Sequence, residues 1–207
     1  MSEFKGTPSV FEGYTRSIKH SCEAVLHAQA ELENAFNAHL PYWSDNIARD
    51  CAKSILAASQ ANKTLYNKAR EKLDFAVTYY NRLLTAERAN KHFTCRLEQE
   101  YVVRINEGDI AKMNRDMSER NIVINLNTMG DFIVKLKAYI HKAGENRELL
   151  ARSCNGWESS FKQSLEGEIQ SISRKLEQEL QTLDRLAKTL DVAYDELMWI
   201  DIMGGKS

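Results

Sequence analysis

The sequence predicts an all-α protein, specifically an antiparallel four-helix bundle made of two tandem helical hairpins. Three observations lead to this prediction: few turn-forming residues, two long stretches with apolar residues at helical spacing, and a constant interval relating one stretch to the other. The 207 residues include only 9 glycines and 2 prolines, fewer than a sandwich, a barrel or a many-looped α/β fold requires. With 43% hydrophobic residues, the chain can bury the core of one compact domain.

The chain is expected to divide into three parts. The first hairpin, the connecting segment and the second hairpin are expected at residues 1–104, 105–127 and 128–207. The four helices are expected at about residues 14–40, 45–90, 128–153 and 158–200. Helical composition continues to Arg104, which would allow the second helix to run several turns beyond its hairpin.

An apolar stripe marks the second of these helices. After Trp43, apolar or small residues recur at alternating steps of four and three from Ile47 to Leu83, with Asn62 as the one polar member. A repeat of about 3.5 residues is typical of helices that pack in bundles or coiled coils. We therefore expect this stripe to face the core.

The second hairpin repeats the first at a constant interval. Trp157 lies 114 residues after Trp43, and the stripe from Phe161 to Leu197 follows its counterpart by the same interval without a gap. An internal repeat of a helical hairpin explains this agreement. The alternative is a chance agreement between two heptad patterns.

The two turns and the connecting segment show different patterns. Pro41 cannot continue a helix, and Gly156 tolerates the left-handed conformation that ends one. Trp43 and Trp157 follow these breaks, so each indole is expected to lie across the end of its hairpin. In the connecting segment, Ile122–Leu126 has the composition of a strand and is expected to pack on the bundle as an extended segment.

Composition also limits compartment and partners. The formal net charge of −1 gives no electrostatic reason to expect a nucleic acid partner. No run of roughly 18 apolar residues could span a membrane, and the N-terminus lacks a Sec signal. A cytoplasmic protein is expected, with export by a route other than Sec left open. Unpaired spacing predicts buried free thiols at the four cysteines, which are Cys22, Cys51, Cys95 and Cys154.

No pattern in the sequence predicts catalysis. None of the five histidines follows a glutamate by three positions, as a di-metal bundle site requires, and glycine-rich phosphate loops are missing. We therefore expect no enzyme activity, no metal and no cofactor. The apolar C-terminal stretch has two interpretations: it closes the end of the bundle, or Trp199, Ile202 and Met203 anchor a protein partner.

Two helices joined by a tryptophan-bearing turn resemble the WXG100 (ESX) family, whose members are linked to type VII secretion. The resemblance covers about residues 11–90 and 125–200 and rests on Trp43 and Trp157. It departs from the family's Trp-x-Gly motif at both turns, because Trp43 is followed by Ser44-Asp45, Trp157 is followed by Glu158-Ser159, and Gly156 precedes its tryptophan. The family pairs hairpins into dimers, so the resemblance implies a fused pseudo-dimer.

The resemblance also implies a role as a substrate, adaptor or chaperone of type VII secretion. The expected partner is a protein: a helical chain, part of the secretion machinery or a toxin. The family's export signal, a tyrosine followed four positions later by an acidic residue, is absent after Tyr80 and Tyr194. Two alternatives remain open, namely a structural or regulatory helical scaffold that could bind a membrane surface, and a homo-oligomer.

Overall fold

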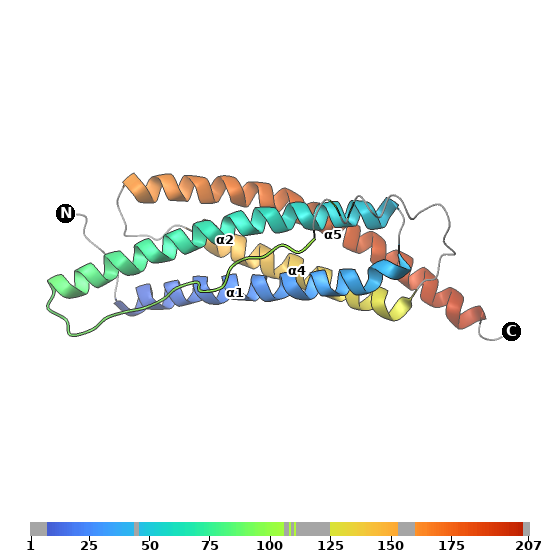
Figure 1. The fold of residues 1–207 in the computed structure, drawn as a ribbon, viewed down its shortest axis with the longest axis horizontal. Helices are drawn as coiled ribbons and strands as arrows, with labels where there is room; N and C mark the ends of the chain where they lie inside the picture. Colours follow the sequence, from blue (N-terminus) through green and yellow to red (C-terminus); the bar gives the residue numbers. More distant parts are fainter. Residues whose placement is uncertain are drawn as a thin grey trace.

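The computed structural model describes residues 8–43, 46–105, 108, 110, 125–152 and 160–204. Four long helices make up most of the regular structure, and together they form an elongated antiparallel bundle (Figure 1). They are α1 (Pro8–His39), α2 (Asn46–Ala86), α4 (Leu126–Ala151) and α5 (Ser160–Gly204), with a short 3-10 helix, η1 (Leu40–Tyr42), after α1. The predicted all-α four-helix bundle is confirmed.

Helices from different hairpins form much of the core. Helix α1 packs against α4, α4 against α5, and α5 against α2 (Figure 1). Helices α1 and α4 are antiparallel: the Tyr14 hydroxyl donates to the Arg152 carbonyl at one end (3.2 Å), and His39 hydrogen-bonds to Thr128 at the other (2.9 Å). The two predicted hairpins thus share one core instead of forming separate domains.

The interval of 114 residues also relates the positions of α2 and α5. Asn46 begins α2 and Ser160 begins α5, at that same interval. Among the α5 side chains that the structure describes, every buried one lies 114 residues after a buried residue of α2. These α5 residues are Leu165, Ile169, Ser173, Leu176, Leu180, Leu183, Ala187 and Leu190. The two helices therefore turn equivalent faces toward the core.

Helices α4 and α1 show the same correspondence with one exception. The buried residues of α4 have buried counterparts in α1, except that Ile133 corresponds to the half-buried Lys19. One predicted member of the α2 stripe is wrong: Ile47 is 44% exposed. It lies in the first turn of α2, at the end of the bundle.

The prediction that α2 continues toward Arg104 is wrong, because the helix ends at Ala86. The N–H of Arg88 donates to the Thr85 carbonyl, and the N–H of Ala89 donates to the Leu84 carbonyl. Arg88 adopts a φ of 56°. This pair of bonds and the left-handed residue form a Schellman motif, which glycine usually completes. An arginine at that position gives no sequence signal for the end of a helix.

After α2 comes a segment that we call the strap (residues 87–105), which begins with this turn and is extended from about residue 91. Its buried side chains alternate with exposed ones: Phe93, Cys95 and Leu97 are buried, whereas Thr94 and Arg96 are exposed. The strap lies between α1 and α2, which contact each other less extensively than the other neighbouring pairs (Figure 1). The extended segment predicted at Ile122–Leu126 lies mostly outside the described residues, although Leu126 itself begins α4.

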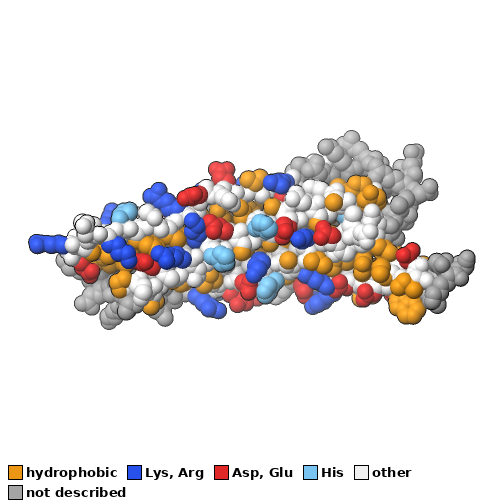
Figure 2. Space-filling view, turned by 90° about the horizontal axis from the view of Figure 1, so that it is seen from below, with side chains coloured by type: hydrophobic (Ala, Val, Ile, Leu, Met, Phe, Trp, Pro, Cys, Tyr) orange, Lys and Arg blue, Asp and Glu red, His pale blue; other side chains and the backbone are white. Residues whose placement is uncertain are grey.

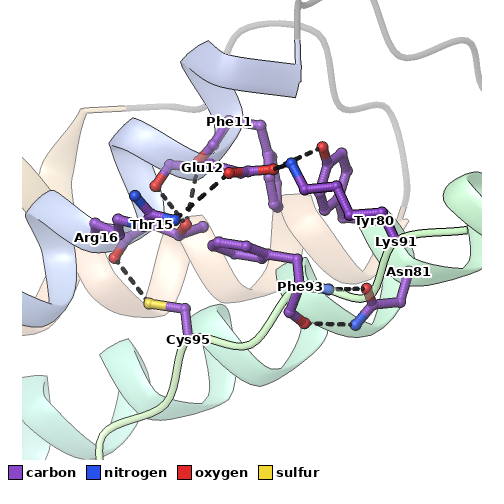
Figure 3. Close-up of polar contacts among 9 residues, drawn as sticks. All are labelled: Phe11, Glu12, Thr15, Arg16, Tyr80, Asn81, Lys91, Phe93 and Cys95. Atoms are coloured by element: carbon purple, nitrogen blue, oxygen red, sulfur yellow. Dashed lines mark hydrogen bonds and ion pairs between the residues drawn. The ribbon is translucent and has the colours of Figure 1, made fainter.

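Side chains of α1 and α2 hold the beginning of the strap (Figure 3). Asn81 bonds both backbone groups of Phe93: its amide nitrogen donates to the carbonyl at 2.8 Å, and its amide oxygen accepts from the N–H at 2.9 Å. The Phe93 ring lies 6.3 Å from Phe11 and 5.7 Å from Tyr80, between the two helices. The Asn81 amide thus satisfies the two backbone groups that a partner strand would otherwise bond, and no strand pairs with this backbone in the part of the chain that the structure describes.

The strap runs parallel to α1 along much of its length. Phe93 contacts Phe11 near the start of α1, and the N–H of Arg104 donates to the Glu33 carboxylate at 3.0 Å near its end. A short run of strap therefore spans twice as many residues of α1. This ratio is expected, because an extended chain rises about 3.3 Å per residue and a helix about 1.5 Å.

Candidate partner-binding site

Of the predicted turn residues, Trp43 is described, whereas Gly156 and Trp157 lie outside the described residues. Trp43 follows η1 directly and is half-buried. Its ring centroid lies 5.3 Å from that of His39 and 5.9 Å from that of Phe132 in α4. The indole thus joins the end of α1 to a helix of the other hairpin.

His39 is a buried histidine that we expect to make stability depend on pH. Burial lowers the pKa of the imidazole, so the folded state favours the neutral ring. The unfolded chain binds a proton more readily, so stability is full above the ordinary histidine pKa of about 6.5 and falls as the pH drops through it. Thermal unfolding between about pH 7.5 and 5.5 should show this loss. His39→Gln should weaken the dependence, whereas Asn37→Gln, at an exposed position of the same helix, should leave it unchanged.

A polar cluster lies in the middle of the core. Gln29 donates to Glu33 at 2.8 Å within α1, and Ser59 and Tyr101 donate to the Gln29 amide oxygen at 2.8 and 3.2 Å. All four side chains are buried. The cluster joins α1 and α2 to the strap, and since the Glu33 carboxylate also accepts from the strap backbone, it fixes the position of the strap in the core.

Asn62 and Tyr139 form a second buried pair, in which the Asn62 amide donates to the Tyr139 hydroxyl at 2.6 Å. Burial raises the pKa of Tyr139 to about 12 and also raises the pKa of Tyr101. Both hydroxyls therefore stay protonated near neutral pH. Asn62 stands out in the sequence as the polar member of the apolar stripe, but nothing near it in the sequence indicates its partner, which lies 77 residues away.

We expect Asn62 and Tyr139 to be energetically coupled. Tyr139→Phe should lower the free energy of unfolding by about 1–3 kcal/mol, because it leaves the Asn62 amide buried without its acceptor. Asn62→Leu introduces leucine, which is the residue at the equivalent position of α5, Leu176. The loss of stability in the double variant should be smaller than the sum of the losses in the two single variants. Urea unfolding of the four proteins measures this. Additive losses would contradict the coupling.

The described cysteines are buried and unreactive in character. Cys22, Cys51 and Cys95 are free thiols in the core, as predicted, and Cys154 lies outside the described residues. Burial raises the pKa of Cys22 and Cys51 to about 12, so neither is a thiolate at neutral pH. Among the residues that the structure describes, no group of three or more His, Cys, Asp or Glu could hold a metal ion.

The C-terminal part of α5 extends past the helices that cover the rest of it (Figure 1). Gly130 of α4 lies against Tyr194, where an added Cβ would sit 3.3 Å from the hydroxyl. Because α4 and α5 are antiparallel, the start of α4 at Leu126 lies near Met198. Helices α2 and α5 are also antiparallel, and Lys68 of α2 pairs with Glu168 of α5 at 2.7 Å. Counting back from Lys68 along α2 therefore places its start, Asn46, near Leu190 of α5. Trp199 and Ile202 therefore lie beyond both starts.

This part of α5 has two apolar faces. Leu190 and Leu197 continue the stripe that faces the core. Val192 and Trp199 each follow one of these leucines by two positions, which places them about 160° away around the helix axis. Val192 is 60% exposed and Trp199 is 67% exposed. An apolar face directed away from the core cannot close the end of the bundle, which favours the second interpretation of this stretch.

We call the exposed apolar residues of this part of α5 the α5 face: Val192 and Trp199 lie opposite to the core stripe, and Ile200 and Ile202 lie on either side of Trp199. Figure 2 shows hydrophobic side chains exposed toward the end where α5 leaves the bundle, with acidic side chains next to them. The side chain of Met203, the third predicted anchor, lies outside the described residues. The structure thus places Trp199 and Ile202 on the same exposed part of one helix.

Three acidic residues accompany the α5 face: Asp195, Glu196 and Asp201. None of them has an ion-pair partner within the described part of the chain, whereas Asp191 pairs with Lys137 of α4. Asp201 lies in the last turn of α5, where the negative partial charge of the helix end makes an acidic residue unfavourable, whereas Asp195 and Glu196 lie about two turns earlier, outside the reach of that effect.

The equivalent end of α2 provides an internal comparison. The residues 114 positions before Val192, Glu196 and Trp199 are Thr78, Arg82 and Thr85, and all three are polar or charged. Helix α2 turns the equivalent face toward the core without an apolar outer face. The α5 face is therefore an addition that the bundle itself does not require.

No family model, curated protein or solved structure matches this chain. Within the described residues, no helix combines the length and apolar character needed to cross a membrane.

Proposed function

We propose that the chain is a non-catalytic protein-interaction module that binds a protein partner through the α5 face. One observation carries this proposal: Trp199 and Val192 are exposed on the side of α5 opposite to the core, with the exposed Ile200 and Ile202 beside them. Tryptophan is one of the residues enriched among those that contribute most of the binding energy near the centre of protein interfaces. Exposing such a group without a partner is unfavourable, because apolar surface is stabilised by removal from water.

We further propose that the module is a fused pseudo-dimer of WXG100-like hairpins and acts as a substrate, adaptor or chaperone in type VII secretion. The support for this is the equivalence of α2 and α5, which begin 114 residues apart and bury corresponding positions. Packing of α1 against α4 and of α2 against α5 is the kind of contact that two separate hairpins would make in a dimer.

Affinity purification from the native host tests the proposed binding. The tagged wild-type chain should retain a protein that the double variant Trp199→Ser/Ile202→Ser loses. The matched control is Val10→Ser/Val134→Ser, which removes two exposed apolar side chains elsewhere, and it should retain the same protein. Equal recovery with both variants would contradict the proposal.

The secretion context has its own test. Deleting the type VII secretion ATPase of the host should change the amount of the chain, or of the protein it retains, in the culture medium. If neither amount changes, the scaffold alternative accounts better for the chain. Binding to anionic vesicles that weakens with salt would instead favour the membrane-surface version.

A further inference from the structure

We infer that the partner segment that binds the α5 face is a basic amphipathic helix. The inference rests on the proposed function and adds the chemistry of the partner. It requires a segment with apolar residues along one side, to cover Trp199 and Val192, and lysine or arginine residues at the borders of that side.

The shape of the site favours a helix. A shallow hollow on α5 is lined by Val192, Asp195, Glu196, Trp199 and Ile200. These residues recur at steps of three, one, three and one, which is the ridge pattern that one helix presents to the groove of another. A helix laid along α5 would pack on the side of α5 opposite to α4 and α2, and its apolar face would cover Val192 and Trp199.

The charges of the site favour a basic partner. Asp195 and Glu196 line the hollow, Asp201 lies in the next turn, and residues 191–202 contain no lysine or arginine. The last turn of α5, which holds Asp201, also carries the negative partial charge of the helix C-terminus. Cationic side chains from a partner would pair with these carboxylates and would also interact favourably with the helix end.

The same charges disfavour other occupants. An anionic membrane would be repelled by the three carboxylates, because polybasic segments are what such surfaces attract. A second copy bound face to face would bring two sets of carboxylates together, and like charges across an interface are destabilising. Both cases remain as outcomes that the experiment can detect.

Peptide binding to the full chain tests the inference. The probes are three fluorescein-labelled helices of about five turns with the same leucine positions, carrying lysine, glutamine or glutamate elsewhere. Fluorescence anisotropy should give the lowest Kd for the lysine peptide, and this Kd should rise with salt. Sedimentation of the chain alone, as a function of concentration, reports any binding of a second copy.

Variants show whether the α5 face is the binding site. Asp195→Asn/Glu196→Gln should raise the Kd of the lysine peptide about tenfold, as expected for the loss of two exposed ion pairs. Trp199→Ser should raise it about thirtyfold. The matched control, Asp74→Asn/Glu100→Gln, removes two exposed acidic groups elsewhere and should leave the Kd unchanged.

The possible failures are distinguishable. Equal affinity for the lysine and glutamine peptides, or an unchanged Kd in Asp195→Asn/Glu196→Gln, would overturn the inference while leaving the proposed function to its own test. Self-association that Trp199→Ser abolishes would identify a second copy as the occupant and would also overturn it. If the variant Trp199→Ser/Ile202→Ser retains the same host protein as the wild type, the proposed function itself fails.

Discussion

Replacing Phe93 with alanine is expected to lower the free energy of unfolding by about 3–5 kcal/mol. The ring is buried between α1 and α2, where it contacts Phe11 and Tyr80. Removing it leaves a cavity at the place where the strap enters the bundle, and the strap has few backbone hydrogen bonds that could compensate. Urea unfolding followed by circular dichroism measures the change.

The adjacent residue provides the control. Thr94 is exposed, so Thr94→Ala should change the free energy of unfolding by less than about 0.5 kcal/mol. Limited proteolysis adds a local readout, because release of the strap should create cleavage sites within residues 87–105 of Phe93→Ala only. Equal stability and equal cleavage of the two variants would show that the strap is not part of the core.

Phe132→Ala is expected to have an effect of similar size, about 3–5 kcal/mol. Phe132 lies in α4, is fully buried, and packs its ring against Phe36, His39 and Trp43 at 5.6–6.2 Å. These three residues belong to the end of α1 and the turn after it. The substitution therefore tests the contact between hairpins, which a fused pseudo-dimer requires.

Val134, two residues further along α4, is the matched control for Phe132. Its side chain is 61% exposed, so Val134→Ala should be nearly neutral. Differential scanning calorimetry of both variants compares the two faces of the same helix. A loss of less than about 1 kcal/mol in Phe132→Ala would contradict the packing of α1 on α4.

The sequence predicts the long helices well because their signal is local and repeated. Each turn of α2 and α5 carries its own apolar residue, so the buried face and the common interval can both be recognised without tertiary information. The exact ends are less evident. Helix α4 begins at Leu126 because Asn125 caps it, its side chain accepting from the Thr128 N–H at 3.2 Å, whereas a start near residue 128 was predicted.

The strap could not be predicted in the same way. Its first signal, the end of α2, depends on a left-handed Arg88, which the sequence does not indicate. Its second signal, the alternation from Phe93 to Ile105, is visible in the sequence but is interrupted by the polar Gln99. Within the described residues no strand pairs with the strap, and the bonds from Asn81 and from the helices favour its extended conformation.

The candidate site could be predicted in part. The composition of the C-terminal stretch identifies Trp199 and Ile202, and the helical period places Val192 with Trp199. The sequence does not show how far α5 extends past α4 and α2, because that depends on pairings such as Gly130 with Tyr194. The buried polar cluster was missed for the same reason, since its members come from three or more separate segments.

Site-specific photocrosslinking in the native host tests the central claim most directly. A photoreactive phenylalanine analogue is placed at Trp199 in one strain and at Val134, on the exposed face of α4, in another. We expect a crosslink to one protein from position 199 and none to that protein from position 134. The absence of any crosslinked protein at position 199, or the same product from both positions, would contradict binding through the α5 face.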